Sequence, residues 1–192
     1  IGSVNSTTGV TASGTVSVAT QSGNLSVTQA VSTVDTSDSA IVLNAGQASA
    51  AGTASGGDIQ LSGSYSFSTG TGGRTTFYTG NTSNANLTSL VGSGSGRFRY
   101  NSDESTANYT AALGSGLYAI YREAPIYTIA LNSVTKTYDG LVTATVNGSP
   151  IRTEWFDFSA ANLVSGDQVS GLALQSGATS TFASKDAGAR QV

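Results

Sequence analysis

The stretch AIVLNAGQASAAGTASGGDIQLSG, residues 40–63, is the most informative part of the sequence for the fold. It holds two short runs of aliphatic and β-branched residues, separated by glycine and other small residues that favour turns. Similar runs occur at TVSV (15–18), NLSV (24–27) and TTFYTG (75–80). Because helical periodicity is nearly absent, the sequence predicts an all-β chain.

The spacing of these runs favours a solenoid. Ile41, Ile59 and Phe77 are evenly spaced, so the step from the first to the second equals the step from the second to the third. That step is on the scale of one coil of a parallel β-helix, in which stacked coils share a continuous core. An antiparallel sandwich would also contain many short strands. The repeated step leads us to predict a right-handed parallel β-helix over residues 1–96.

The composition changes at Arg97. Residues 97–125 hold three of the eight basic residues and five aromatic residues. We expect a short helix over about 103–113, followed by a strand in LYAIYRE (117–123). A segment of this kind is typical of a cap, because the last coil of a solenoid must not recruit further strands. We therefore assign 97–125 as a cap or linker.

Residues 126–192 follow an antiparallel pattern. The motif KTYDG (136–140) separates two alternating runs, and its Asp139-Gly140 pair is a strong signal for a two-residue hairpin. IRTEWFDFS (151–159) is a candidate for a further strand. The sequence predicts a small antiparallel β-sandwich for this part.

The composition excludes several classes of function. Of the 192 residues only 10% are charged, the net charge is −3, and Cys and His are both absent. The chain therefore has no disulfide, no thiolate nucleophile and no imidazole base, which closes the Ser–His and Cys–His catalytic routes. No basic run suggests nucleic acid, and no apolar run is long enough to insert in a membrane. A Ser/Thr/Gly/Ala-rich chain that lacks cysteine is typical of an exported bacterial surface protein.

Acidic residues in the expected solenoid do not form a convincing catalytic pair. Parallel β-helices can host polysaccharide lyases and hydrolases, which use clustered carboxylates or basic residues beside them. Here Asp35, Asp38, Asp58 and Arg74 are few and dispersed. We interpret Asp35 and Asp38 as a solvated corner, and we assign no catalytic residues.

Other candidate sites also have simpler explanations. Asp103 and Glu104 are adjacent, so a place at the start of the expected helix, where they would act in capping, explains them better than acid–base chemistry. Asp139 and Asp167 have hard oxygen ligands suited to calcium, but both fall in turns. GGDIQL (56–61) matches only one copy of a calcium-binding repeat. We assign no metal and no cofactor.

Two further motifs have plain structural explanations. Trp155, Phe156 and Phe158 would suit a carbohydrate-stacking platform, but burial in the sandwich core is the better explanation. GSGSG (92–96) is rich in glycine, yet it lacks the spacing of a phosphate loop and is assigned as a plain loop. Residues 74–80 and 97–123 carry the most varied side chains.

The second half of the sequence resembles a known module. KTYDGLVTATV (136–146), SGDQV (165–169) and ATSTFASKDAG (178–188) are similar to the YDG module, a β-sandwich repeat of filamentous-haemagglutinin-type adhesins that follow two-partner secretion. The stretch from SAIVLNAG (39–46) to ALGSGLYAIYREAP (112–125) resembles the region that precedes such modules. No catalytic residues belong to the family pattern.

This resemblance implies an exported, non-enzymatic adhesin at the cell surface or in the extracellular matrix, acting in adhesion, aggregation or biofilm cohesion. Expected partners are polysaccharide or protein receptors, or further copies through open β edges. The module usually continues past its KDAG stretch, so we expect the sandwich to be C-terminally incomplete and open to strand exchange. The alternatives are a carbohydrate-active β-helix enzyme and a self-assembling extracellular filament subunit.

Overall fold

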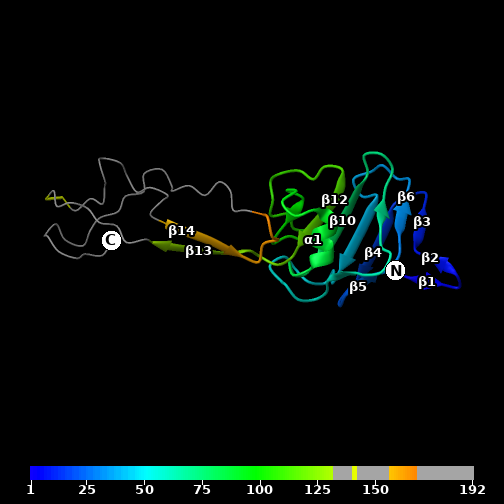
Figure 1. The fold of residues 1–192 in the computed structure, drawn as a ribbon, viewed down its shortest axis with the longest axis horizontal. Coiled ribbons are helices and arrows are strands. Elements are labelled where there is room, and N and C mark those ends of the chain that lie inside the picture. Colours follow the sequence, from blue (N-terminus) through cyan, green and yellow to red (C-terminus); the bar gives the residue numbers. More distant parts are fainter. Residues whose placement is uncertain (132–139, 142–155, 168–192) are drawn as a thin grey trace. The chain divides into compact units, whose positions relative to one another are not determined.

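A computed structural model describes residues 1–131, 140–141 and 156–167 (Figure 1). The chain divides into two compact units, which we describe separately. The first unit comprises Ile1–Ile126 and Ala161–Gln168, and the second comprises Tyr127–Ala160 and Val169–Val192. The described elements are, in chain order, β1 (Ser3–Val4), β2 (Thr7–Thr8), β3 (Val10–Ala12), β4 (Val16–Thr20), β5 (Leu25–Val27), β6 (Val31–Thr33), β7 (Ile41–Ala45), β8 (Ile59–Leu61), β9 (Phe67–Ser68), β10 (Arg74–Thr79), α1 (Ala85–Val91), β11 (Phe98–Arg99), β12 (Gly116–Tyr121), β13 (Ile126–Leu131) and β14 (Phe156–Ala161).

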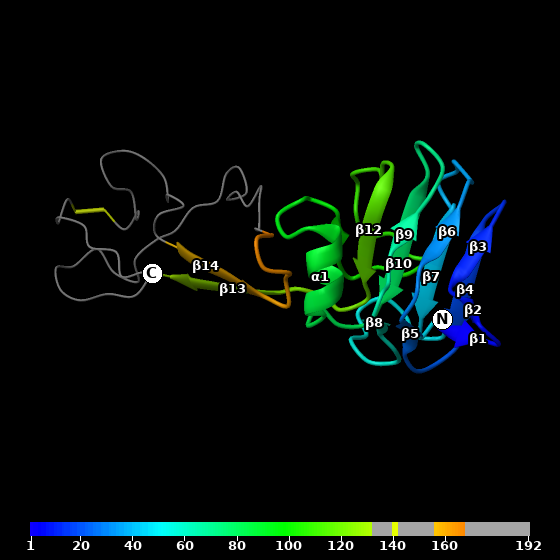
Figure 2. The same ribbon diagram turned by 45° about the vertical axis from the view of Figure 1, so that its right-hand side comes forward.

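Three parallel sheets make up most of the first unit. Their strand orders are β3-β6-β9, β11-β12-β10-β7-β4 and β5-β8, and the strand pairs within them run parallel. The chain visits the sheets in a recurring order, from β3 through β4 to β5 and then from β6 through β7 to β8 (Figure 2). The all-β prediction is confirmed for the part of the chain that the structure describes, with one short helix added. In the first unit, only β1 and β2 pair antiparallel among the described strands.

The strands predicted within residues 15–80 are present, but the step from Ile41 to Ile59 does not correspond to one return of the chain to the same sheet. Leu25 pairs with Ile59, and Ile41 pairs with Thr75, so each of these returns is almost twice as long as the predicted step. Between β4 and β7 the return is shorter, because Val16 pairs with Ile41. Strands separated by the predicted step therefore lie in different sheets, with β7 in the five-stranded sheet and β8 beside β5. The prediction that this step spans one coil is wrong.

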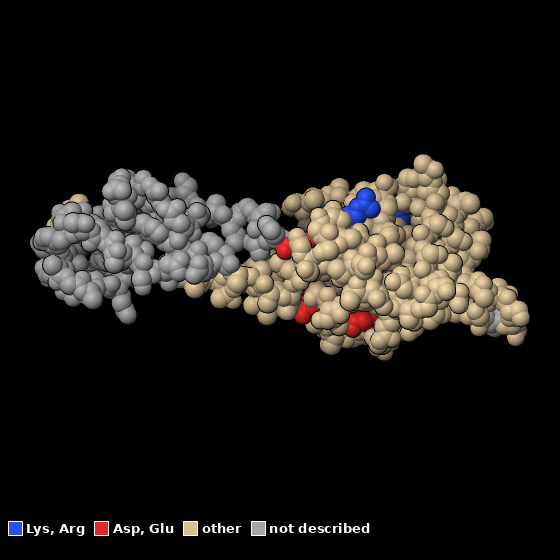
Figure 3. All heavy atoms as spheres, in the orientation of Figure 1, with Lys and Arg blue, Asp and Glu red and all other residues tan. Residues whose placement is uncertain are grey.

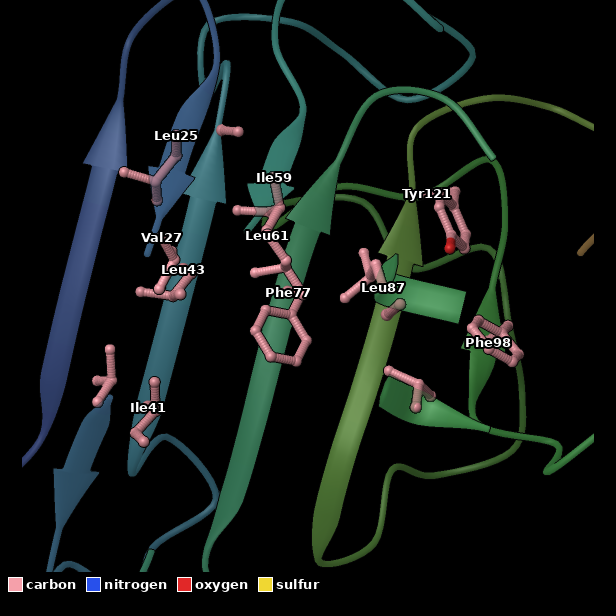
Figure 4. Close-up of a cluster of buried hydrophobic side chains, with 14 of the residues drawn as sticks. Leu25, Val27, Ile41, Leu43, Ile59, Leu61, Phe77, Leu87, Phe98 and Tyr121 are labelled. Carbon is pink, nitrogen blue, oxygen red and sulfur yellow. The ribbon is translucent and has the colours of Figure 1, made fainter. Parts of the chain in front are cut away.

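The core lies between the three sheets. Alternate residues of each strand point inward, as in β7, where Ile41 and Leu43 are fully buried. Phe77 of β10 packs edge-on against Phe67 of β9, with ring centroids 4.8 Å apart. Each buried side chain of this size contributes about 1.5–3 kcal/mol, so these layers supply the main driving force for folding. Figure 4 shows the cluster, whose buried members include Leu25, Val27, Ile41, Leu43, Ile59, Leu61, Phe77, Leu87, Phe98 and Tyr121.

The helix is not where the sequence predicted it. Residues 103–113 contain no helix, so that prediction is wrong. The helix α1 lies earlier in the chain, where the side chain of Asn84 accepts a hydrogen bond from Leu87 N and Gly92 ends the helix at a φ of 97°. Leu87 and Val91 face the core at a spacing of four positions.

Helix α1 covers an edge strand. Asn86 Nδ2 donates a hydrogen bond to Leu61 O at 2.8 Å, and Asn84 Nδ2 donates to Ile59 O. These amides occupy backbone acceptors of β8 that a further strand would otherwise use, so the edge of the β5-β8 sheet is protected. Within the described residues, no helix has the length and apolar character needed to cross a membrane.

Strands β13 and β14 form a two-stranded sheet. They confirm the first part of the strand expected from residue 126 and the last part of the one expected in 151–159. Of the predicted Asp139-Gly140 hairpin, Gly140 has the required positive φ, at 77°. Asp139, Trp155 and the rest of the expected sandwich lie outside the described residues.

Candidate functional site

The outward face of the five-stranded sheet carries arginine and tyrosine side chains. Phe77 of β10 and Ala119 of β12 point into the core. Because alternate residues of a strand face opposite sides, Arg74, Tyr78 and Tyr118 lie on the outward side. We call this surface the arginine–tyrosine face. It consists of Arg74, Tyr78, Arg97, Arg99, Tyr109 and Tyr118.

Strand register brings these residues together from distant parts of the sequence. Arg74 pairs with Gly116 and Thr76 with Tyr118 in the parallel ladder of β10 and β12. On the other side of β12, Phe98 pairs with Ala119. Residues 74–80 and 97–123, which the sequence marked for their varied side chains, thus both contribute to one surface, although other side chains of these ranges, among them Phe77, Phe98 and Tyr121, are buried in the core. The sequence signal for the basic pair is Arg97-x-Arg99, because alternate residues of a strand face the same side.

The ring of Tyr118 is the centre of this face. The Cζ atom of Arg97 lies 5.7 Å from the Tyr118 ring centroid, and that of Arg99 lies 5.6 Å from it. Arg99 is also 5.3 Å from the ring of Tyr109. Gly114 N donates a hydrogen bond to the Tyr118 hydroxyl at 2.9 Å, which fixes the ring. Both guanidinium groups lie within the distance at which a cation is attracted to an aromatic ring.

The three arginines differ in how their charge is compensated. Arg74 forms an ion pair with Asp38 at 3.4 Å, and its Nη1 donates to Leu113 O at 3.2 Å. Nη1 of Arg99 donates to the carbonyl oxygens of Gly96 and Phe98. Arg97 makes no hydrogen bond or ion pair within the described part of the chain. Arg97 and Arg99 are therefore cations without a carboxylate partner there.

Gly116 leaves room for Arg97. A Cβ atom at Gly116 would overlap Nη1 of Arg97, and the residue has a φ of 94°, which favours glycine. The absent side chain lets the guanidinium lie beside β12. The position of Arg97 is thus set by the backbone and the Tyr118 ring rather than by a hydrogen bond.

The loop that crosses this face is anchored by Asp103. Its Oδ2 accepts a hydrogen bond from Ala51 N at 2.7 Å, and its Oδ1 accepts from the backbone N–H groups of Ser105 and Thr106. Burial acts to raise the pKa of Asp103, but these hydrogen bonds outweigh it and the pKa lies below the ordinary 3.8. The expectation that this residue lies at the start of a helix is wrong, because its contacts cap a turn that is not helical.

Asp103 makes stability depend on pH. Because its pKa is lowered on folding, its contribution is present above pH 3.8 and is lost as the pH falls through the folded-state pKa. We expect Asp103→Asn to lower the free energy of unfolding at pH 7 by about 1–3 kcal/mol. Toward pH 2 the variant and the native chain should converge in urea titrations. Glu104→Gln is the control, because Glu104 is exposed and has no such anchor. A constant gap from pH 7 to pH 2 would contradict the role given to Asp103.

Arg122 is the most deeply buried charge in the described residues. Its side chain is 0% exposed. Nη2 donates to Gly57 O at 2.6 Å, whereas Nε and Nη1 have no partner. Burial lowers the pKa of Arg122, and the nearby carboxylates of Asp58, Glu104 and Asp103 act in the opposite direction. Nothing in the sequence pattern distinguished this arginine from the exposed ones.

The other predicted acidic residues, Asp35, Asp38 and Asp58, each contact a different partner. Asp35 accepts a hydrogen bond from Ser37 N at 2.7 Å in an exposed corner, and the Asp38 side chain is 82% exposed. Asp58 accepts hydrogen bonds from both the backbone and the side chain of Asn81. Within the described residues, no three acidic side chains gather closely enough to hold a metal ion.

Asp167 has a specific partner. Tyr100 donates its hydroxyl to Asp167 Oδ2 at 2.6 Å, and Val164 N donates to the same hydroxyl at 3.1 Å. Burial and the hydrogen bond to Asp167 raise the pKa of Tyr100. Through these contacts Tyr100 binds residues 164–167, which belong to the first unit. Asp139, the other residue of the calcium hypothesis, lies outside the described residues.

No family model, no curated protein and no solved structure matches this chain. On the face that Figure 3 shows, a few acidic and basic groups lie among uncharged side chains. Arginine and tyrosine side chains that converge on such a neutral surface can bind an anion and hold an organic ring beside it. The part of this face formed by Arg97, Arg99, Tyr109 and Tyr118 is therefore the candidate site. Arg74, whose charge is paired with Asp38, lies outside it.

Proposed function

We propose that the first unit is a right-handed parallel β-helix forming the stiff part of an exported, non-enzymatic bacterial surface adhesin. The observation that carries this proposal is the recurring order in which the chain visits its three parallel sheets. Each return lays a strand in register on its predecessor, so apolar residues stack between sheets. The winding direction and the role are both part of the proposal.

The elements in the last part of the stack support a stalk with a protected end. Helix α1 covers the edge of β8, and the loop anchored by Asp103 crosses the outward face near β12. These elements belong to the last part of the stack, where a solenoid needs a surface that does not recruit strands. In our proposal these elements form the cap of the stack.

A stiff, weakly charged stalk suits adhesion through many contacts. Copies displayed together on a cell would each contribute a weak interaction, and their joint binding would be strong because the effective local concentration is high. The resemblance of residues 136–188 to the YDG module supports placement on the cell surface.

The proposal can be tested in the organism that encodes the chain. We expect an epitope inserted between Thr71 and Gly72, two exposed turn residues, to be labelled by antibody on intact cells. Deletion of the coding region should reduce cell aggregation or attachment. A tagged cytoplasmic protein serves as the control for lysis. Detection of the epitope only after lysis would overturn the assignment to the cell surface.

A further inference from the structure

The arginine–tyrosine face contains two cations whose charge is not balanced locally. The Cζ atoms of Arg97 and Arg99 lie 5.7 Å and 5.6 Å from the centroid of the Tyr118 ring. Among the described residues, the only ion pair on this face belongs to Arg74 and Asp38. Two like charges beside one ring repel each other, and a bound anion would relieve that repulsion.

We propose that Arg97 and Arg99 bind the carboxylate of an acidic sugar, with Tyr109 beside its ring. This inference deepens the proposed function, on which it rests, by naming a class of receptor: a polysaccharide that contains uronic acid. A guanidinium group presents paired N–H donors that match the two oxygens of a carboxylate.

The donors available for this role can be named. All N–H groups of the Arg97 guanidinium are without hydrogen-bond partners in the described part of the chain. Nη1 of Arg99 is occupied by backbone carbonyl oxygens and its Nε is buried, which leaves Nη2. Arg97 is therefore the main contact, and Arg99 adds charge and one donor.

The aromatic part of the site is built around the same cations. Tyr118 is buried and holds the Arg97 guanidinium in place, whereas Tyr109 is half-buried and lies against Arg99. In a uronic acid the carboxylate is attached to a carbon of the sugar ring. When the cations bind the carboxylate, the sugar ring therefore lies beside them, where the aromatic ring of Tyr109 offers an apolar surface. A neutral sugar would leave both cations uncompensated.

A nucleic acid fits this site less well. The chain has a net charge of −3, and binding to a nucleic acid backbone usually relies on many separate cationic contacts. Apart from the buried Arg122, only one pair of uncompensated arginines occurs in the described residues. The geometry therefore favours one carboxylate at a time, repeated along a polymer by many copies of the protein.

Isothermal titration of the purified 192-residue chain tests the proposal. The ligands are a galacturonic acid tetramer, the same tetramer with its carboxylates methyl-esterified, inorganic sulfate and a thymidine oligonucleotide. We expect binding of the acidic tetramer that weakens with added salt, and at least about tenfold weaker binding of the ester. Equal binding of the ester, or stronger binding of sulfate or the oligonucleotide, would overturn the assignment.

Variants localise the binding. Arg97→Gln is expected to weaken binding of the acidic tetramer by about tenfold, and Arg99→Gln by a smaller factor. Arg74→Gln is the matched control, since its charge is already paired with Asp38, and it should change binding by less than about twofold. Thermal unfolding midpoints of Arg97→Gln and the native chain should differ by no more than a few degrees, because Arg97 makes no hydrogen bond within the described residues and only its contact with the Tyr118 ring is lost. Equal loss in the Arg74 and Arg97 variants would refute the site. Because these experiments use purified protein, their failure leaves the labelling experiment on cells independent.

Discussion

Replacing Gly57 with alanine is expected to lower the free energy of unfolding of the first unit by about 2–6 kcal/mol, the sum of backbone strain and overpacking. Gly57 lies just before β8, where the chain turns back toward the core. Its φ of 152° is a conformation that residues with a side chain rarely adopt.

The space around Gly57 is closed by backbone. A Cβ atom there would overlap the carbonyl oxygen of Gly23 and would lie 2.7 Å from the Gly23 carbonyl carbon and 3.0 Å from Gly46 N. Backbone atoms cannot rotate aside as the end of a side chain can. Gly23 N donates a hydrogen bond to Gly56 O, so moving these segments apart would also break the contact between two neighbouring corners.

Gly14→Ala is the matched control. Gly14 has no atom within 4 Å of a Cβ placed on it, and its φ is not positive. We expect this change to alter the free energy of unfolding by no more than about 0.5 kcal/mol. Urea titrations followed by far-ultraviolet circular dichroism compare the two variants. Equal midpoints for both variants would mean that the corner at Gly57 is not closely packed.

These corners also explain why the sequence predicted strands better than register. Alternation of apolar and polar residues is local, and it located β7, β8 and β10 closely. Which strands become neighbours depends on the length and path of the corners between them. The corner from Gly46 to Asp58 is long and held by contacts between glycine backbones, which no periodic pattern reveals.

The sequence pattern did not predict helix α1 for a related reason. Its seven residues give less than two full turns of the helix, too few for a clear hydrophobic pattern. The boundary signals were present, with Asn84 before the helix and Gly92 after it. Residues 103–113 offered similar boundary residues, but there Asp103 accepts hydrogen bonds from the backbone of a non-helical turn.

Only part of the candidate site could be predicted from the sequence. The alternation of Arg97 and Arg99 predicts that both lie on one side of an extended segment. Their aromatic partners Tyr109 and Tyr118 could not be assigned, because that requires the pairing of β11 with β12 and the path of the intervening loop. The burial of Arg122 could not be predicted from the sequence either, because burial of a charged side chain depends on its tertiary neighbours.

The second large effect on the free energy of unfolding is expected from replacing Arg122. We expect Arg122→Ala to lower the free energy of unfolding by about 2–4 kcal/mol, since it empties the space of a long, fully buried side chain. Arg122→Met should cost less than about 1.5 kcal/mol, because methionine keeps most of the volume and is flexible enough to follow the same path.

The small cost expected for Arg122→Met also depends on which groups stay paired when the guanidinium group is removed. Gly57 O, the one acceptor of Arg122, also accepts a hydrogen bond from Gly80 N at 3.0 Å, so it stays paired when the guanidinium is removed. Asp58 keeps its hydrogen bonds from Asn81. Two of the three nitrogens of the Arg122 guanidinium have no partner, so burying this charge is costly in the native chain.

Arg122→Lys separates volume from charge. Lysine keeps the charge but loses the planar group that reaches Gly57, so its ammonium would be buried with the carbonyl contact weakened. We expect the order of stability Met above Lys, and Lys above Ala, in urea titrations at pH 7. If Met were as damaging as Ala, the link from Arg122 to Gly57 would matter more than packing. Arg122 would then stabilise the native chain through its charge and hydrogen bond, and the two unpaired nitrogens would be a minor cost.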